Sequence, residues 1–176
     1  YNFEYDNQGR VSFYDYCSLY SGSGTCDYYD TNNYTYSSNG TVTNSYVYEV
    51  GSDYEEAGTL TLQLDNNGNI IGGNDSYLDI DENGNPISVT VTASFEYDNQ
   101  NSPFKNIVGM DAFILMDIIS SEYLYLLGFN TFNNCLSRNF EYSDGDSDSD
   151  TYVYDYNEDG YPRQIITYES DGFEQT

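Results

Sequence analysis

The sequence predicts an all-β fold: a large curved antiparallel meander sheet or open barrel of about ten strands, with a short helical insert packed on one face. Three observations predict it. A turn motif recurs along the chain, apolar and polar residues alternate on either side of it, and the composition includes 22 Tyr and 9 Phe but no Trp or His. Aromatic and β-branched residues favour strands. We expect residues 1–176 to form a single β-rich domain, since this length supports one core.

The turn motif begins with Asp, Asn or Ser, continues with two polar residues, Gly and any residue, and ends with an apolar residue or Pro. It occurs at residues 6–11, 37–42, 65–70, 81–86 and 157–162. The pattern is typical of a three-residue hairpin loop in which Gly takes a positive φ and closes a bulge. The first side chain accepts a backbone hydrogen bond inside the turn. The motif therefore predicts consecutive β-hairpins.

The turn positions also predict which residues face each other across each hairpin. The predicted pairs are Tyr5 with Val11 and Phe3 with Phe13 around Gly9, Leu64 with Ile70 around Gly68, and Tyr156 with Pro162, Tyr152 with Ile166 and Asp155 with Arg163 around Gly160. In each hairpin one face collects the apolar and aromatic side chains. This alternation is typical of a half-buried antiparallel sheet.

The turn at Gly40 allows two registers. A tight two-residue Asn-Gly turn would pair Tyr36 with Thr43, whereas the bulged turn pairs Tyr36 with Val42. A slip of one residue turns every side chain to the other face of the sheet. We favour the bulged turn because it keeps four tyrosines on one face: Tyr34, Tyr36, Tyr46 and Tyr48.

Two kinds of segment interrupt the hairpins. The polar stretches 22–24 and 30–33 have the composition of loops or bulges. Residues 110–127 are rich in Met, Phe, Ile and Leu, and they predict a helix or helical pair that starts near Asp111 and ends before Gly128. Acidic residues interrupt this segment too often for a membrane span. We expect it to cover one face of the sheet, and an apolar docking surface or lid is the alternative.

An acidic segment near the C-terminal end suggests calcium. Residues 139–142 and 151–154 predict one hairpin with residues 144–150 as its tip. Asp144, Asp146, Asp148 and Asp150 alternate in that tip, as oxygen ligands do in the first part of a calcium loop. The Gly and the closing Glu of an EF-hand are missing, so a solvated hairpin tip is the alternative. Calcium is the one cofactor that the sequence suggests.

The three cysteines do not form a zinc motif, because no His and no Cys-x-x-Cys spacing accompanies them. Cys17 and Cys26 bracket a plausible hairpin tip. A disulfide there would contribute about 2–3 kcal/mol and imply an oxidising compartment. Two unpaired thiols in adjacent strands are the alternative. We expect Cys135 to be buried.

The chain has a formal net charge of −26, with only four cationic residues: Arg10, Lys105, Arg138 and Arg163. Such a surface repels phosphate backbones and anionic membranes, so nucleic acid is excluded as a partner. The charge favours solubility and protects exposed sheet edges, and cation binding is the alternative.

Catalysis has little support in the sequence. His, the commonest general base, is absent, and no Ser lies in a Gly-x-Ser-x-Gly elbow. We predict that the protein is not an enzyme, with a glycan hydrolase using a carboxylate pair as an alternative. The tyrosines of the Tyr34–Tyr48 set, or Tyr152, Tyr154 and Tyr156, would suit sugar stacking, although ordinary packing is favoured. A carrier that holds an apolar ligand in a half-barrel cavity is a further alternative, suggested by residues 110–127.

Residues 3–11 read Phe-Glu-Tyr-Asp-Asn-Gln-Gly-Arg-Val, which resembles a YD repeat: Tyr-Asp, two residues, Gly, Arg and an aliphatic residue. Residues 154–165 are similar. With residues 101–107 in mid-chain, these hairpins resemble an uncharacterised family of Bacteroidetes envelope lipoproteins whose label mentions porphyran. The resemblance implies a secreted or lipid-anchored protein of the cell envelope, periplasmic or on the outer-membrane surface, and an association with polysaccharide. It implies no catalytic or binding residues.

The expected function is a non-catalytic cell-envelope protein that binds a glycan or a protein partner. The chain opens inside a predicted strand at residues 1–5, and we find no signal peptide or lipidation motif in it. We therefore expect the targeting segment, and any lipid anchor, to lie outside this sequence.

Overall fold

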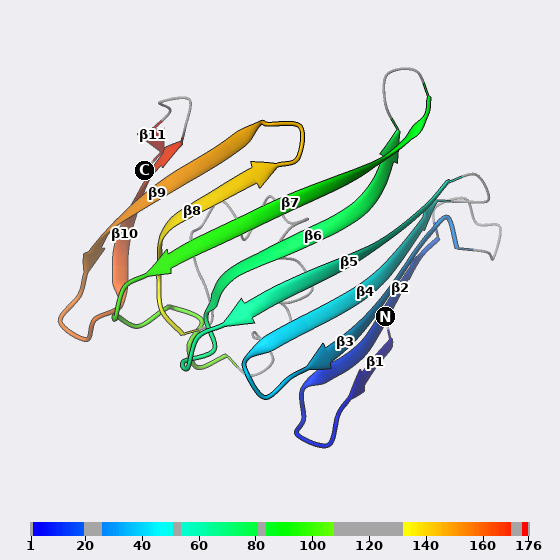
Figure 1. Cartoon of the computed structure of the whole chain (residues 1–176). Coiled ribbons are helices and arrows are strands. Elements are labelled where there is room, and N and C mark those ends of the chain that lie inside the picture. Colours follow the sequence, from blue (N-terminus) through cyan, green and yellow to red (C-terminus); the bar gives the residue numbers. More distant parts are fainter. Residues whose placement is uncertain are drawn as a thin grey trace. The chain divides into compact units, whose positions relative to one another are not determined.

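The computed structural model describes residues 2–19, 26–50, 54–80, 84–107, 132–169 and 174–175. Within them, eleven strands follow one another in a single hydrogen-bonded order from β1 to β11 (Figure 1). Every strand pair whose register is described runs antiparallel. The predicted all-β antiparallel meander is confirmed. No helix in this described part of the chain has the length and apolarity needed to cross a membrane.

The strands have these bounds: β1 (Asn2–Tyr5), β2 (Val11–Ser18), β3 (Tyr28–Tyr36), β4 (Thr41–Val50), β5 (Tyr54–Leu64), β6 (Ile70–Ile80), β7 (Pro86–Tyr97), β8 (Cys135–Tyr142), β9 (Ser147–Tyr156), β10 (Pro162–Glu169) and β11 (Glu174–Gln175). Alternation is clearest in β7, where buried Val91 and Ala93 are separated by exposed Thr92. The helical insert predicted for residues 110–127 lies outside the described residues.

The predicted turns are present wherever the structure describes all of their residues. Gly9, for example, has a φ of 78°, and its N–H donates to the carbonyl of Asp6 at 3.1 Å. A second bond, from the N–H of Asp6 to the carbonyl of Arg10, closes the loop at 2.8 Å. Positive φ values occur at every glycine that the motif selects: Gly9, Gly40, Gly68, Gly84 and Gly160. The sequence prediction missed one such turn, at Gly145, because Tyr142 occupies its first position.

The register next to each turn is also as predicted where it is described. Tyr5 pairs with Val11, and Tyr156 pairs with Pro162. In the hairpin of β3 and β4, Tyr36 pairs with Val42, which confirms the bulged turn over the two-residue alternative. The pairing there continues without a shift, so Tyr34, Tyr36, Tyr46 and Tyr48 share one face.

Farther from the turns, two predicted registers are wrong. In the first hairpin a shift follows the first pair, so Phe3 pairs with Tyr14 instead of Phe13. The rings of Phe3 and Tyr14 stack with their centroids 5.4 Å apart. A bulge places one extra residue on β2 and moves all later pairs by one.

The hairpin of β9 and β10 is shifted in the same way. A shift between Pro162 and Gln164 leads Tyr152 to pair with Thr167 instead of Ile166. Asp155 likewise pairs with Gln164 instead of Arg163. Arg163 still forms an ion pair with Asp155, because the long guanidinium side chain reaches across the bulge. The turn motif therefore does not predict the additional bulge in the strand that follows the turn.

The contacts within the chain group it into two compact units. Unit 1 comprises residues 1–62 and 74–91, and unit 2 comprises residues 63–73 and 92–176. The borders cut across β5, β6 and β7, so each unit contains parts of these strands. The single-domain organisation predicted for residues 1–176 stays a prediction.

Each unit has its own buried side chains. Those of unit 1 are Val11, Tyr14, Tyr34, Val42, Leu60, Leu62 and Val91. Those of unit 2 are Ile70, Ala93, Cys135, Phe140 and Tyr152, and Phe140 packs edge-on against Phe95. Both units also bury polar residues. Buried polar side chains are uncommon, so they mark candidate functional sites.

Candidate functional site

A polar segment that the composition assigned to a loop lies in the middle of a strand. Residues 30–33 belong to β3, with β2 on one side and β4 on the other. Asp30 pairs with Tyr16 of β2 and with Tyr48 of β4. The loop prediction was wrong because backbone partners on both sides outweigh the low strand propensity of Asp and Asn.

The Asp30 carboxylate is held by two donors on the same face of the sheet. The phenol oxygen of Tyr14 donates to Oδ2 at 3.2 Å, and Nδ2 of Asn32 donates to Oδ1 at 2.8 Å. Burial raises the pKa of Asp30 above its ordinary value, although both hydrogen bonds act to lower it. The carboxylate is therefore oriented and partly desolvated without a ligand.

Asn32 links Asp30 to a third strand. Its Oδ1 accepts a hydrogen bond from Nδ2 of Asn44 on β4 at 2.7 Å. Both asparagines are buried, and Oδ1 of Asn44 accepts no hydrogen bond within the described residues. Buried acceptors without a partner are uncommon. The row Asp30–Asn32–Asn44 thus retains unused acceptor capacity at both of its ends.

Three half-buried tyrosines accompany Asp30 on this face. Tyr16 and Tyr48 flank it in register, and Tyr28 stands two residues before it on β3. The rings of Tyr28 and Tyr48 stack with centroids 6.4 Å apart and an interplanar angle of 29°. We call Tyr16, Tyr28, Asp30 and Tyr48 the tyrosine–aspartate platform. It combines aromatic rings with an oriented hydrogen-bond acceptor.

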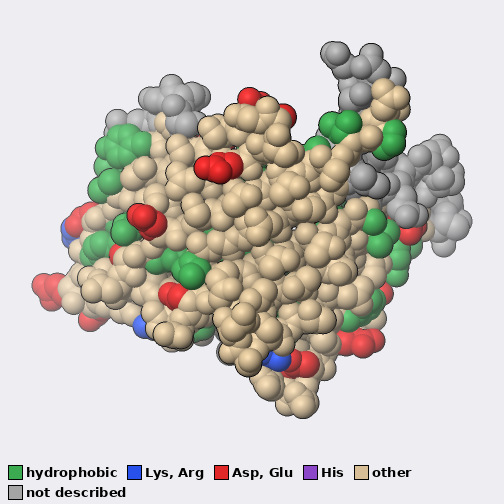
Figure 2. Space-filling view, viewed as in Figure 1, with side chains coloured by type: hydrophobic (Ala, Val, Ile, Leu, Met, Phe, Trp, Pro, Cys, Tyr) green, Lys and Arg blue, Asp and Glu red, His purple; other side chains and the backbone are tan. Residues whose placement is uncertain are grey.

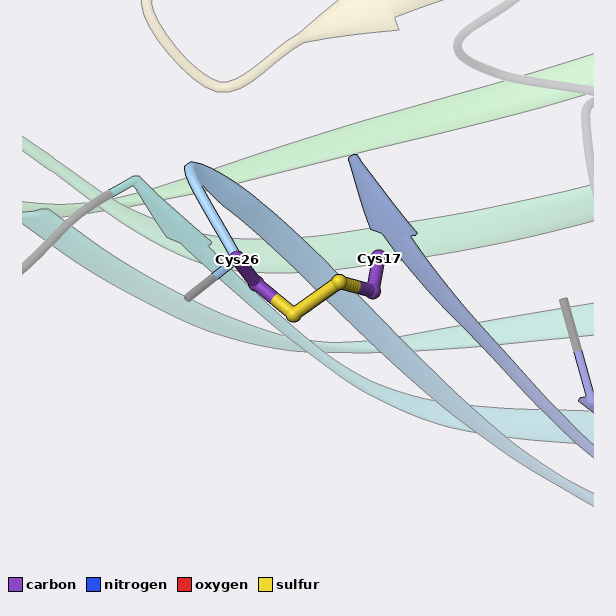
Figure 3. Close-up of a disulfide and its surroundings, with 2 residues drawn as sticks. All are labelled: Cys17 and Cys26. Atoms are coloured by element: carbon purple, nitrogen blue, oxygen red, sulfur yellow. A yellow bond between two sulfur atoms is a disulfide. The ribbon is translucent and has the colours of Figure 1, made fainter. Parts of the chain in front are cut away.

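A disulfide between Cys17 and Cys26 closes the hairpin beside the platform (Figure 3). Cys17 directly follows Tyr16, and Cys26 lies two residues before Tyr28. The N–H of Asp27 donates to the carbonyl of Ser18 at 2.8 Å, which continues the pairing up to the bridge. The bridge thus restrains the ends of the two strands that carry Tyr16, Tyr28 and Asp30.

The stripe of Tyr34, Tyr36, Tyr46 and Tyr48 serves mainly for packing. Tyr34 is only 4% exposed. Tyr36 donates from its phenol oxygen to the carbonyl of Val11 at 2.8 Å, and the Arg10 guanidinium lies 4.0 Å from its ring centre. Such contacts join neighbouring hairpins. Tyr48 is the member of this predicted stripe that also belongs to the tyrosine–aspartate platform.

Tyr46 reaches across a whole strand. A Cβ atom on Gly58 of β5 would lie 2.3 Å from the tip of the Tyr46 ring. The ring can therefore occupy this place only because residue 58 has no side chain. The phenol oxygen then donates to both carboxylate oxygens of Asp75 on β6, at 3.1 and 3.2 Å. Gly58 therefore lets β4 bond to β6 over β5.

The second predicted tyrosine set, Tyr152, Tyr154 and Tyr156, also packs. Tyr152 is 2% exposed. Tyr154 donates to the carbonyl of Cys135 at 2.7 Å, and Tyr156 donates to the Asp98 carboxylate. Burial raises the pKa of both Tyr154 and Tyr156. The rings of Tyr154 and Tyr156 also stack, with centroids 5.8 Å apart. Both phenols are engaged inside unit 2, and the carboxylate beside them, Asp98, already accepts four hydrogen bonds.

The predicted acidic tip is wrong in its extent. The turn runs from Tyr142 to Asp146 around Gly145, and β9 begins at Ser147. Asp148 and Asp150 therefore lie in a strand, because Glu141 pairs with Ser147 and the hairpin is tighter than predicted. Asp144, the third residue of this turn, accepts a hydrogen bond from the N–H of Asp146 at 3.0 Å.

The four predicted calcium ligands have different surroundings. Asp150 is 3% exposed and forms an ion pair with Arg138 on β8. Among the described residues, which include Asp144, Asp146, Asp148 and Asp150, no three acidic, Cys or His side chains form a group that would hold a metal ion. Calcium binding at this segment stays a prediction without a preformed site.

Cys135 is buried, as predicted, and is not disulfide-bonded. Burial raises the pKa of its thiol to about 12. The thiolate is the reactive form of cysteine, so Cys135 is not set up as a nucleophile.

Unit 2 contains the other prominent polar cluster, at its turns. Asn134, which is fully buried, donates from its backbone N and from Nδ2 to Asp98, each at 3.0 Å. Two hydrogen bonds likewise join Asn69 and Asn133. Nδ2 of Asn69 donates to Oδ1 of Asn133 at 2.9 Å, and the backbone N–H of Asn133 donates to Oδ1 of Asn69 at 3.2 Å. These hydrogen bonds join segments that are far apart in the sequence, so the cluster serves to hold those backbone segments together.

No protein-family model matches the chain, and no curated protein matches it. Among solved structures, it is similar to a porin-like protein from Bacteroides vulgatus ATCC 8482. The two are 14% identical, the match covers 98% of this chain and 74% of the other, and the TM-score is 0.61. At this identity the likeness shows a shared fold.

Sequence reasoning missed Tyr14, Tyr16, Tyr28 and Asp30 as site residues. The signal was nevertheless present, because aromatic residues alternate just before Cys17 and a Tyr-x-Asp sequence follows Cys26. Had the disulfide been assumed, both segments would have become paired strands with these side chains on one face.

Proposed function

We propose that this protein is a non-catalytic, extracytoplasmic protein of the cell envelope that binds a glycan on the tyrosine–aspartate platform. One observation carries the proposal: the carboxylate of Asp30 on β3 is oriented by Tyr14 and Asn32 and flanked in register by Tyr16 and Tyr48. Sugars present hydroxyl donors at their edges and C–H groups on their faces. A carboxylate accepts the former, and aromatic rings pack against the latter.

Three observations support a location in the envelope. The disulfide between Cys17 and Cys26 suits an oxidising compartment. A solved structure with the same fold is described as porin-like, which agrees with an envelope protein. The resemblance of residues 3–11, 101–107 and 154–165 together to a family of envelope lipoproteins points the same way.

A non-catalytic role is supported by the chemistry of the chain. The sequence contains no His. The one cysteine outside the disulfide has a pKa raised to about 12, which suppresses its thiolate. We therefore favour binding over the hydrolase alternative, which predicts cleavage of the bound glycan.

A glycan array tests the proposal. The wild-type protein should bind at least one glycan, and Tyr48→Ala should weaken that binding about tenfold, since a stacked ring contributes roughly 1–1.5 kcal/mol. Tyr168→Ala is the matched control, because Tyr168 is a 43% exposed tyrosine of unit 2. Equal losses in the two variants, or an array without any signal, would contradict the proposal. Release of shorter sugars from a bound glycan would favour the hydrolase instead.

A further inference from the structure

Each of the few cationic side chains has an identified ion-pair or hydrogen-bond partner. The chain has four of them, and three are in ion pairs: Arg10 with Asp6 at 2.6 Å, Arg138 with Asp150, and Arg163 with Asp155. The fourth, Lys105 in unit 2, donates to Asn101 at 2.8 Å.

Only Arg10 belongs to unit 1, the unit of the platform. It precedes β2, and Tyr16 follows it by roughly 20 Å of extended strand at about 3.3 Å per residue. Asp6 and the ring of Tyr36 hold it at that end. No cationic side chain of unit 1 is therefore available to pair with an anionic ligand at Asp30.

The acceptor capacity of Asp30 is half used. A carboxylate has about four acceptor positions, and Asp30 receives two hydrogen bonds from the described part of the chain, one on each oxygen. One position on each oxygen remains for a ligand. Two neighbouring hydroxyl groups of a sugar ring match this arrangement, since each would donate to one oxygen of the same carboxylate.

We propose that the platform selects uncharged sugars, binding two neighbouring hydroxyls on the Asp30 carboxylate, and that it discriminates against sulfated and uronic residues. This inference rests on the proposed function and specifies its ligand class. A sulfate or carboxylate group near Asp30 would place like charges together in partly desolvated surroundings, where repulsion is stronger than in water. The formal net charge of −26 acts in the same direction. Isolated carboxylates and few cationic side chains are visible on the face drawn in Figure 2.

The first test varies the ligand and leaves the protein unchanged. Binding is measured by calorimetry with glucan and galactan oligosaccharides of equal length, each in neutral and sulfated form, and with an oligogalacturonate. We expect the neutral form to bind at least tenfold more tightly than its sulfated counterpart at low ionic strength. The difference should shrink as salt screens the charges.

The second test assigns the selectivity to Asp30. Asp30→Asn should weaken binding of the neutral oligosaccharide about tenfold, because hydrogen bonds to a charged acceptor are the stronger ones. It should leave binding of the sulfated form unchanged or improve it. Asp15→Asn is the matched control, since it removes the same charge from the opposite face of β2.

The outcomes separate this inference from the proposed function. If sulfated or uronic oligosaccharides bind as well as neutral ones, the inference is overturned and glycan binding stands. If Asp15→Asn changes the selectivity as much as Asp30→Asn does, net charge is the cause and the assignment to Asp30 is overturned. If no oligosaccharide binds in either form, both the inference and the proposed function fail. Circular dichroism spectra that match the wild type confirm that each variant is folded.

Discussion

Two aspartates show how the same side chain serves different purposes in the two units. Asp98 of unit 2 accepts hydrogen bonds from Gln100 and Asn134 on one oxygen, and from Asn134 and Tyr156 on the other. Its acceptor capacity is full. Among the residues that the structure describes, two donate hydrogen bonds to Asp30 of unit 1. A saturated carboxylate stabilises the fold, whereas a half-used one remains available to a ligand.

The two environments reinforce this difference. The donors to Asp98 are Gln100 just after β7, Asn134 just before β8 and Tyr156 at the end of β9, so its carboxylate ties distant backbone segments together. The donors to Asp30 come from β2 and β3, which the sheet already holds together. Removing Asp98 should therefore damage the structure, and changing Asp30 should damage mainly binding.

The largest effect is expected for Asp98→Asn. An amide nitrogen would replace one carboxylate oxygen, and in either orientation it would meet an N–H donor of the fully buried Asn134. We expect the free energy of unfolding to fall by about 3 kcal/mol, from a lost charge-assisted bond and a buried donor left without an acceptor. Urea unfolding at pH 7 measures it.

The comparison variant is Asp30→Asn. Here the amide fits: its oxygen can accept from Asn32, and its nitrogen can donate to the phenol oxygen of Tyr14. The stability should change by less than about 0.5 kcal/mol. A loss as large as that of Asp98→Asn would show that Asp30 is a structural residue and would remove the contrast between the two aspartates.

A somewhat smaller loss is expected when the disulfide is removed. The double variant Cys17→Ser, Cys26→Ser should lose about 2–3 kcal/mol, because the bridge restricts the unfolded chain. It should also weaken glycan binding, since the strand ends that carry Tyr16 and Tyr28 lose their restraint. Thermal unfolding and calorimetry measure the two effects.

Cys135→Ser provides the control for that double variant, because it changes a cysteine that forms no disulfide and lies in unit 2. It should leave the affinity for the glycan unchanged. If the double variant unfolds more easily but binds as tightly as the wild type, the bridge does not organise the platform.

The turns were predictable because their requirement is local. A positive φ is acceptable mainly to glycine, so Gly9, Gly40 and Gly160 marked the turns and the first residue pair of each hairpin. The bulges one residue farther on were not predictable, since any residue can occupy them. The turn at Gly145 was missed because Tyr142 stands where Asp, Asn or Ser was expected.

The site was harder to predict because it depends on neighbours far away in the sequence. Asp30 and Asn32 have the composition of a loop, and only β2 and β4 on either side hold them in a strand. The Tyr34–Tyr48 stripe was correctly placed on one face of the sheet, but the sequence did not predict how exposed each of its tyrosines is. Tyr34 is buried and Tyr48 is half-buried, although the alternation treats them alike.

The smallest effect is a difference in pH dependence. Burial raises the pKa of Asp30 in the folded state, so the folded protein binds more protons than the unfolded chain just above pH 3.8. The ionised carboxylate therefore lowers stability, and this penalty appears as the pH rises through the raised pKa. Asp30→Asn removes the penalty, and its stability relative to the wild type should be higher at pH 7 than at pH 3.

Asp6 should behave in the opposite way. Hydrogen bonds from the backbone and side chain of Arg10 lower the pKa of Asp6 below 3.8, so its ionised form stabilises the folded state. That contribution is present above pH 3.8 and is lost as the pH falls through the lowered value. Asp6→Asn should thus be less stable than the wild type at pH 7, with the difference fading towards pH 3. Urea unfolding of both variants at the two pH values gives the signs, and equal signs would show that Asp30 is stabilised by its partners as Asp6 is.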